Sequence, residues 1–124
     1  MEELLVLKCQ KCGSTIVRMN KTCCTPHCCG EEMKLLRANT TDAALEKHVP
    51  VVEHKDGKLI VKVGGVEHPM TPEHFIPFVA VVSEGKISLK ELKPGEKPVV
   101  CFDDVEHGVA YAYCNLHNLW KAEF

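Results

Sequence analysis

Cysteine and histidine are the residues in this 124-residue chain whose types and spacing could support metal chemistry, with eight of the former and seven of the latter. Thiolates bind soft ions such as zinc and iron, and clustered cysteines in a reducing compartment are more often metal ligands than disulfides. Six of the cysteines precede position 30: Cys9, Cys12, Cys23, Cys24, Cys28 and Cys29. The N-terminal part of the chain therefore predicts a sulfur-ligated metal site.

The first two ligands of this site are predicted by the motif Cys9-x-x-Cys12, whose turn places both sulfur atoms on one side of the backbone. The second pair of ligands is either Cys28-Cys29, which precedes a glycine, or Cys23-Cys24. Neighbouring residues project their side chains in different directions, so either pair requires a bent backbone. Spacing alone leaves both pairs open, and a zinc ion with a purely structural role is an alternative to a redox centre.

A second group of possible ligands is scattered through the rest of the chain. His48, His68 and His74 each lie in a segment that contains a proline, and Cys114-x-x-His117 follows near the C-terminus. Small and large residues alternate before Cys114, which falls on the small-residue side, where there is room for a bound atom. Four imidazoles and one thiolate would leave one position open on a metal, as in catalytic sites.

The remaining histidines and one further cysteine are not expected to bind metal. His27, His54 and His107 lie in polar surroundings and are interpreted as solvated. Cys101 belongs to the apolar run 99–102 and is predicted to be a buried core thiol.

The elements that position these residues form two regions. The segment 1–37 has few large apolar residues, so a metal would have to serve as its core, with short strands around Leu4, Val6 and positions 16–17 flanking the Cys9–Gly13 turn. The polar stretch 38–42 marks the boundary. Beyond it, short apolar segments separated by turn signals predict strands, at 51–52, 59–63, 75–82, 86–92, 99–102 and 109–113.

The second region is expected to be a small immunoglobulin-like β-sandwich without a helix of ordinary length, and the whole chain is predicted to be all-β. Asp56-Gly57 and Glu84-Gly85 are typical of tight turns between strands. A net charge of −2 argues against nucleic acid as a partner, and no apolar run is long enough to span a membrane. Residues 1–8 open with acidic residues and lack a signal-peptide pattern, so a cytoplasmic location is predicted.

Five segments together resemble desulfoferrodoxin, the two-iron form of superoxide reductase. They are Glu-Lys-His-Val-Pro at 46–50, His-Pro-Met at 68–70, His-Phe-Ile at 74–76, Cys-Asn-Leu-His-Asn-Leu-Trp at 114–120 and Cys-Cys-Gly-Glu-Glu-Met-Lys at 28–34. The resemblance spans nearly the whole chain, and it assigns the second N-terminal ligand pair to Cys28 and Cys29. Cys23, Cys24, His27, Glu32 and Asn118 depart from the family pattern.

The resemblance implies two iron centres in a homodimer. A desulforedoxin-like domain at 1–37 would hold one iron through Cys9, Cys12, Cys28 and Cys29. A catalytic domain at 38–124 would hold Fe(II) through four histidines in a plane and one axial cysteine: His48, His68, His74, His117 and Cys114. The implied reaction is the one-electron reduction of superoxide to hydrogen peroxide, with electrons from a rubredoxin-like donor.

The resemblance also implies roles for two charged neighbours of the ligand His48. Lys47 would attract superoxide and help to organise a proton donor, and Glu46 would close the open position of the oxidised metal. Two other functions are considered: a binding protein made of a zinc ribbon and an immunoglobulin-like domain, and an electron carrier that uses only the four-cysteine iron. Neither has a use for the later set of four histidines and Cys114.

Overall fold

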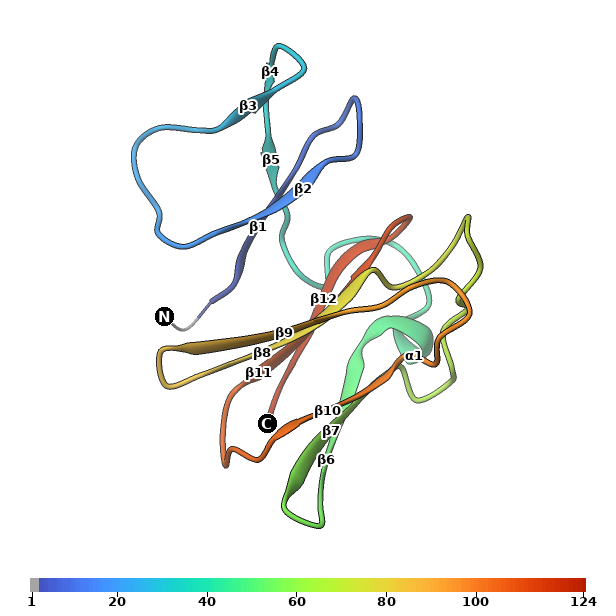
Figure 1. The fold of residues 1–124 in the computed structure, drawn as a ribbon. Coiled ribbons are helices and arrows are strands. Elements are labelled where there is room, and N and C mark those ends of the chain that lie inside the picture. The colour runs from blue at the N-terminus through green and yellow to red at the C-terminus, as the bar shows by residue number, and fades with distance from the viewer. Residues whose placement is uncertain (1–2) are drawn as a thin grey trace.

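The computed structural model describes residues 3–124, which form a small N-terminal unit resting on a larger β-sandwich (Figure 1). Met1 and Glu2, which belong to the predicted first domain and to the acidic opening of the chain, lie outside the described residues. Strands dominate both parts, so the all-β prediction is confirmed. Across residues 3–124, no helix is long and apolar enough to cross a membrane.

The N-terminal unit is built from five short strands. β1 (Leu5–Lys8) pairs with β2 (Thr15–Arg18) on one side and with β5 (Lys34–Leu35) on the other, while β3 (His27–Cys28) and β4 (Glu31–Glu32) form a separate hairpin. The predicted strands on either side of the Cys9–Gly13 turn correspond to β1 and β2. β3, β4 and β5 were not predicted, because two residues are too few to show a periodicity.

The sandwich consists of two antiparallel sheets. One has the order β10-β7-β6 and the other has the order β12-β11-β8-β9. Their bounds are β6 Pro50–Lys55, β7 Lys58–Val63, β8 Phe78–Ser83, β9 Lys86–Glu91, β10 Val99–Asp103, β11 Val109–Cys114 and β12 Asn118–Glu123. Apolar side chains from both inner faces, including Leu59, Val79 and Ala112, form the core between the sheets.

Two tight turns occur where the sequence predicts them. Asp56 and Gly57 both have positive φ angles, of 51° and 75°, in the β6–β7 hairpin, and Glu84 and Gly85 do the same in the β8–β9 hairpin, with 47° and 77°. These left-handed pairs match the right-handed twist of the flanking strands. They also set the register that determines which side chains face the core.

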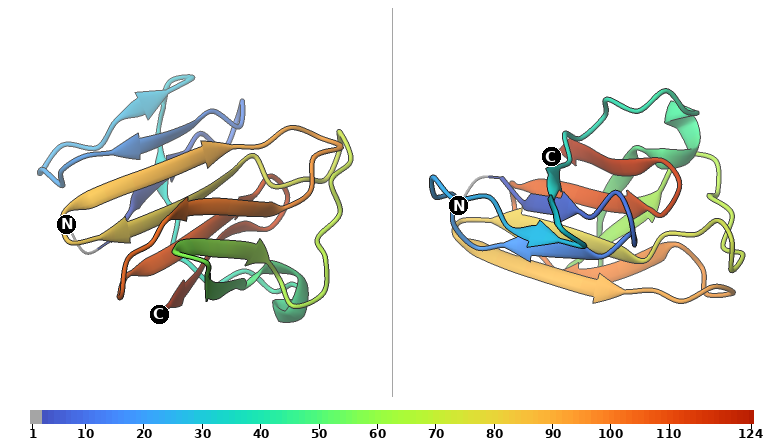
Figure 2. Two further views of the ribbon diagram at one scale, coloured as in Figure 1. Left: turned by 60° about the horizontal axis from the view of Figure 1, so that its bottom comes forward. Right: turned by 90° about the horizontal axis from the view of Figure 1, so that it is seen from above.

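The four-stranded sheet is buried on both faces (Figure 2). On β11, Ala110, Ala112 and Cys114 face the sandwich core, whereas Tyr111 and Tyr113 face a second core that is completed by apolar side chains of the N-terminal unit: Leu4, Val6, Val17 and Leu36. The N-terminal unit therefore does not depend on a metal alone for its packing. Its apolar side chains also pack against the outer face of the four-stranded sheet.

The loop before the sandwich contains the short helix α1 (Leu45–His48), which the sequence did not predict. A four-residue helix gives no readable 3.6-residue periodicity. Strand β12 was also missed, since Asn118 begins it in the left-handed conformation, with φ of 63°. Both elements matter because they flank the histidine-rich site.

Candidate metal centres

Four cysteines come together in the N-terminal unit: Cys9, Cys12, Cys28 and Cys29. Their sulfur atoms all lie within 4.8 Å of one another, with 3.6 Å between those of Cys12 and Cys28 and 3.9 Å between those of Cys28 and Cys29. Two sulfur ligands on a tetrahedral ion with bonds of ~2.3 Å lie ~3.8 Å apart. The cluster therefore has the dimensions of a four-thiolate metal site.

Two turns bring these four sulfur atoms together. In the first, the Gly13 backbone N–H donates to the Cys9 carbonyl at 3.0 Å, and the Cys12 N–H points at the Cys9 sulfur at 3.4 Å. In the second, Cys29 and Gly30 form the tip of the β3–β4 hairpin, with φ angles of 53° and 76°. The left-handed conformation of Cys29 supplies the bend that allows neighbouring cysteines to face one centre.

The thiols of this cluster share protons unequally. The backbone N–H of Cys12 lowers the pKa of Cys9 to about 6, whereas hydrogen bonding with the Cys12 side chain raises the pKa of Cys28 to about 12. The same neighbour raises the pKa of Cys29. The cluster thus holds one readily formed thiolate, Cys9, and two thiols that keep their protons, Cys28 and Cys29, and a bound cation would displace those protons.

The second cluster contains four histidines and one cysteine from separate parts of the sandwich. His48 ends α1, His68 and His74 lie between β7 and β8, Cys114 ends β11, and His117 lies in the β11–β12 turn. Ligand atoms of His48, His68, His74 and Cys114 all lie within 4.8 Å of one another. His117 joins them, since its Nδ1 lies 3.1 Å from His48 Nε2 and 3.8 Å from the Cys114 sulfur.

The four imidazole rings stand at the corners of a quadrangle. The ring centroids of successive neighbours are 4.6–5.0 Å apart in the order His48, His68, His74, His117. The His48 and His74 rings face each other across the centre at 6.3 Å. Successive rings are nearly perpendicular, at 76–88°, so their nitrogen edges converge.

The hydrogen bonds of these rings leave bare nitrogens at the centre. His48 Nδ1 donates to the Ala44 carbonyl and His68 Nδ1 donates to the Pro69 carbonyl, each at 2.7 Å. Because a carbonyl only accepts, both protons are on Nδ1, and the two Nε2 lone pairs face each other at 3.1 Å. His74 Nε2 is buried without any hydrogen-bond partner. Lone pairs in this arrangement repel unless a cation lies between them, so the residues fit a metal ion.

Burial keeps the imidazoles of His48, His68 and His74 neutral. His48 and His68 are each only 2% exposed, and desolvation lowers the pKa of His48 and His74 and lowers that of His68 to about 4. Neutral imidazole is the form that binds metals. Burial raises the pKa of the Cys114 thiol, while the backbone N–H groups of His117 and Leu116 oppose this effect. A cation beside Cys114 would favour its thiolate.

Trp120 supports the site from behind. Its ring stacks on His48 with centroids 4.9 Å apart at 29°, and its indole N–H donates to the His117 carbonyl at 2.9 Å. Trp120 is fully buried. It therefore fixes one ring and the backbone of a second, a role that the sequence did not predict.

Glu46 and Lys47 lie in α1 and are exposed beside the histidine cluster. The positive charge of Lys47 contributes to lowering the pKa of His48 and His74. Lys47 also borders a hollow of about 520 Å³ that reaches His68. Gly64 packs under this helix so closely that an added Cβ would lie 2.5 Å from the Lys47 carbonyl carbon, which makes it a positioning residue that sequence reasoning missed.

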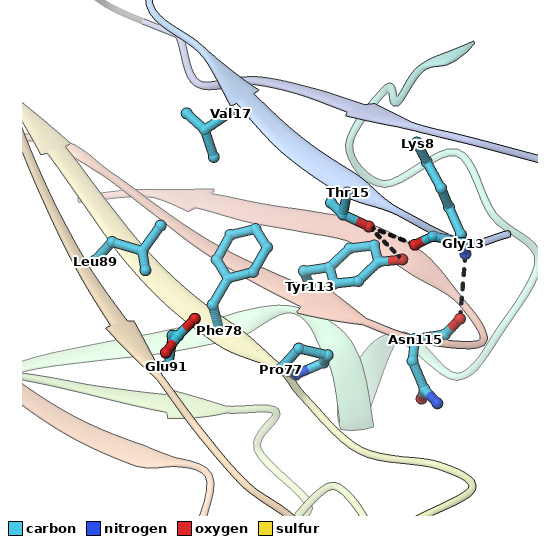
Figure 3. A pocket seen from close by; sticks show the side chains of 10 residues that line it. All are labelled: Lys8, Gly13, Thr15, Val17, Pro77, Phe78, Leu89, Glu91, Tyr113 and Asn115. Atoms are coloured by element: carbon cyan, nitrogen blue, oxygen red, sulfur yellow. Dashed lines mark hydrogen bonds between the residues drawn. The ribbon is translucent and has the colours of Figure 1, made fainter. Parts of the chain in front are cut away.

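The two clusters are connected across the interface between the N-terminal unit and the sandwich, in the pocket shown in Figure 3. Lys8, next to Cys9, donates from Nζ to the Asn115 carbonyl at 3.3 Å and lies 5.6 Å from the centre of the Tyr113 ring. Asn115 follows Cys114 in the chain. The side chain of Lys8, the neighbour of Cys9, thus contacts Asn115, the neighbour of Cys114.

The remaining cysteines and histidines lie apart from both clusters. Cys23 and Cys24 are outside the four-cysteine group, and His27, His54 and His107 are exposed. The prediction of a buried Cys101 is wrong, because that residue is exposed on β10. In this strand Val100 points into the core, so its neighbours on either side point outward.

Comparison with known proteins finds desulfoferrodoxins and superoxide reductases among the similar proteins. A family model described as desulfoferrodoxin matches residues 40–123. A desulfoferrodoxin from Syntrophotalea carbinolica is 44% identical over 123 residues, covering 98% of each chain. The crystal structure of the superoxide reductase from Treponema pallidum aligns with a TM-score of 0.78 and 35% identity, covering 98% of this chain and 99% of that one. A superoxide reductase (1Fe-SOR) from Giardia intestinalis gives 0.57 and 27%, covering 64% and 97%.

Proposed function

The chain belongs to the desulfoferrodoxin family, and we propose that it is a superoxide reductase with its catalytic centre at the histidine cluster. The reaction takes superoxide, one electron and two protons to hydrogen peroxide and releases no dioxygen. The observation that carries this proposal is the convergence of four imidazoles and the buried Cys114 thiol on one point, with bare nitrogens facing inward. A binding protein or a simple electron carrier has no use for this costly arrangement of desolvated groups.

Iron is the metal we assign to both centres. His48, His68, His74, His117 and Cys114 would hold one ion, and Cys9, Cys12, Cys28 and Cys29 would hold the other. Ferrous iron at the histidine site supplies the electron that reduces superoxide, and a thiolate ligand makes that iron electron-rich. Sulfur ligands suit either iron or zinc at the N-terminal site.

The chain's own residues prepare the catalytic site in three ways. The carbonyls of Ala44 and Pro69 hold two imidazoles in the tautomer that presents Nε2 inward. Backbone N–H groups around Cys114 favour its ionised form. The exposed ammonium of Lys47 attracts the anionic substrate through solvent and can hold a water molecule that delivers a proton to the product.

We assign Glu46 as the side chain that would occupy the open position of the oxidised metal. Its carboxylate lies on the exposed helix α1 two residues before His48. A carboxylate is a hard ligand, which suits ferric iron better than ferrous iron. In the reduced state the side chain is free to remain in solvent.

The organisation of the chain follows from the same assignment. We place an N-terminal iron domain at 1–37 and a catalytic domain at 38–124, a boundary supported by the family match that begins at residue 40. An external rubredoxin-like donor is supported by the exposure of Cys12 and Cys29, which brings a bound ion close to the surface. Ile16 and Met19 are exposed apolar side chains of the first domain, and they support a homodimer.

A cytoplasmic location is part of the proposal. All eight cysteines are free, and a four-cysteine cluster and a Cys114 ligand that must all stay reduced fit a reducing compartment.

Metal analysis combined with a product assay tests the proposal. Anaerobically purified protein is expected to contain two iron ions per chain and to convert superoxide to hydrogen peroxide without evolving dioxygen. Protein that carries zinc alone and leaves superoxide untouched would support the binding-protein alternative. Protein with iron only at the four-cysteine centre would support the electron carrier.

A further inference from the structure

Cys23 and Cys24 form a pair of neighbouring thiols for which neither metal centre has a use. Both are exposed and free, and their sulfur atoms lie 4.0 Å apart. They lie in the loop between β2 and β3, on the side of the N-terminal unit that faces away from α1 (Figure 1). A ligand on this pair would therefore be remote from the histidine cluster.

The loop that carries this pair is internally braced. Arg18 donates from Nε to the Asn20 carbonyl at 2.8 Å and from its terminal nitrogen to the Thr22 hydroxyl. The backbone N–H of Cys24 donates to the same hydroxyl oxygen at 3.3 Å. These bonds fix the backbone on which the two thiols stand side by side.

The spacing of the two sulfur atoms suits a shared ligand better than a disulfide. A disulfide requires ~2.05 Å between sulfur atoms and a specific dihedral angle, which adjacent residues reach only by distorting the peptide between them. A tetrahedral ion with bonds of ~2.3 Å places two sulfur ligands ~3.8 Å apart. The observed 4.0 Å is close to this value and to the 3.6–3.9 Å within the four-cysteine cluster.

The side chains around Cys23 and Cys24 limit which ligands this pair could bind. Within residues 3–124, neither thiol belongs to a group of three or more metal-ligating side chains. A tetrahedral divalent ion would thus keep two positions unfilled by protein, whereas a trivalent arsenic atom that already carries one organic group needs only two thiolates. Cys24 also lines a cavity of about 120 Å³ that has an apolar and a polar part. The apolar side chains are Leu5, Leu7, Met33 and Leu35, and the polar ones are Arg18, Lys21, Thr22 and Thr25. An organic group on the arsenic atom would bury its apolar area against the first set.

We propose that Cys23 and Cys24 form a binding site for monosubstituted trivalent arsenicals, with the organic group seated against the apolar side chains of the neighbouring cavity. Binding is a condensation in which both S–H bonds and the bond or bonds from arsenic to oxygen break and two arsenic–sulfur bonds form. With an arsine oxide, the two thiol protons leave with the oxide oxygen as one water molecule. With a dihydroxy arsenical such as methylarsonous acid, each thiol proton leaves with one hydroxyl group, which gives two water molecules. Arsenic remains trivalent and both sulfur atoms keep their oxidation state, so no oxidant or reductant is consumed.

Intact-mass measurement of the iron-loaded protein with phenylarsine oxide tests this site. The protein is freed of dithiol reductants beforehand, since these compete for arsenic. We expect one adduct per chain, formed with loss of one water molecule and without release of iron. Cys23→Ser and Cys24→Ser should each lose the adduct, while the matched control Cys101→Ser, which removes an exposed thiol elsewhere, should keep it.

The cavity is tested separately through Leu35, which lines it and is 41% exposed. A monothiol is titrated in to compete with the protein for each arsenical. Leu35→Ala should lower the monothiol concentration that removes phenylarsine oxide by about tenfold, because the phenyl group buries apolar area against Leu35. The concentration that removes methylarsonous acid should not change, because its methyl group does not reach the cavity. An adduct that persists in the Cys23→Ser/Cys24→Ser double variant, or no adduct on wild type, would overturn the site. Equal weakening of both arsenicals would overturn the role of the cavity.

Discussion

The cysteine cluster lies largely open to solvent, whereas the histidine cluster is half-buried at one end of the sandwich. Cys12 and Cys29 are exposed and only Cys9 is buried, at 2%. Two of the four histidine rings are equally buried, and carbonyl groups fix the orientation of those two. The first site is therefore shaped by two exposed turns, and the second by side chains that are partly packed into a core.

The difference also appears in the protonation of the ligands. In the cysteine cluster, thiols influence one another, and the pKa values of Cys9 and Cys28 move in opposite directions. In the histidine cluster, burial keeps His48, His68 and His74 neutral and raises the pKa of the Cys114 thiol. Metal binding must expel protons from several thiols of the first cluster, whereas in the second only the Cys114 proton has to leave and bare nitrogens supply the other contacts.

The largest effect is expected from replacing Cys114 by serine. This variant removes the thiolate from the buried site while leaving the cysteine cluster intact, because the two share no residue. We expect superoxide reduction to be abolished, a loss beyond the ~10- to 100-fold that outer-shell changes cause. The N-terminal iron and its visible absorption should persist.

Pulse radiolysis and iron analysis of Cys114→Ser check this expectation, with Cys101→Ser as the matched control. Near-normal reduction of superoxide by the serine variant at full iron loading would show that Cys114 is not the ligand we assign.

Replacing Cys28 or Cys29 by serine disrupts the cysteine cluster and leaves the histidine cluster intact. We expect loss of the N-terminal metal and loosening of the β3–β4 hairpin, because each residue provides one quarter of the ligand set. The catalytic iron should remain, since the core of the sandwich does not depend on that hairpin. Metal content and limited proteolysis measure both effects.

The control for this experiment is the Cys23→Ser/Cys24→Ser double variant, which should keep its N-terminal metal. If the double variant lost that metal instead, the ligand pair would have to be reassigned.

A smaller effect is expected from acidifying the metal-free protein. Burial lowers the pKa of His68 to about 4, while the unfolded chain takes up that proton near 6.5. The unfolded state therefore binds more protons between these values, and stability falls as pH drops from about 6.5 towards 4. This loss is about 2.6 kcal/mol, so we expect the unfolding temperature of the sandwich to fall by at least about 10 °C over this range.

Calorimetry of the metal-free protein at several pH values measures this slope, and His68→Gln should reduce it. A variant with the same slope as wild type would mean that other groups control the acid response.

The smallest effect is expected from Lys47→Ala. A single exposed cation should change the rate with superoxide by about two- to fivefold at low salt, and salt should suppress the difference because it screens charges within ~10 Å. Iron binding should be unchanged. Pulse radiolysis at several ionic strengths provides the measurement, with Lys55→Ala at the far hairpin as control.

Identical rates and salt dependence for Lys47→Ala and wild type would remove Lys47 from the mechanism.

The sequence by itself determined the features that depend on near neighbours. Alternating apolar residues identified most strands of the sandwich, and Asp56-Gly57 and Glu84-Gly85 located two of its hairpins, because a left-handed turn needs only local residue types. The alternation along β11 also placed Cys114 on the side that faces the core. Chemically distinctive side chains marked both groups of candidate ligands.

Other features were decided by the tertiary structure. His48 and His117 meet at 3.1 Å although 69 positions separate them, because α1 and the β11–β12 turn lie at the same end of the sandwich. The apolar run 99–102 could not show that Cys101 points outward, since apolar residues on both faces conceal the alternation. Which face a strand buries, and which carbonyl sets the tautomer of a histidine, depend on residues distant in sequence. Only the packed fold brings those residues into contact.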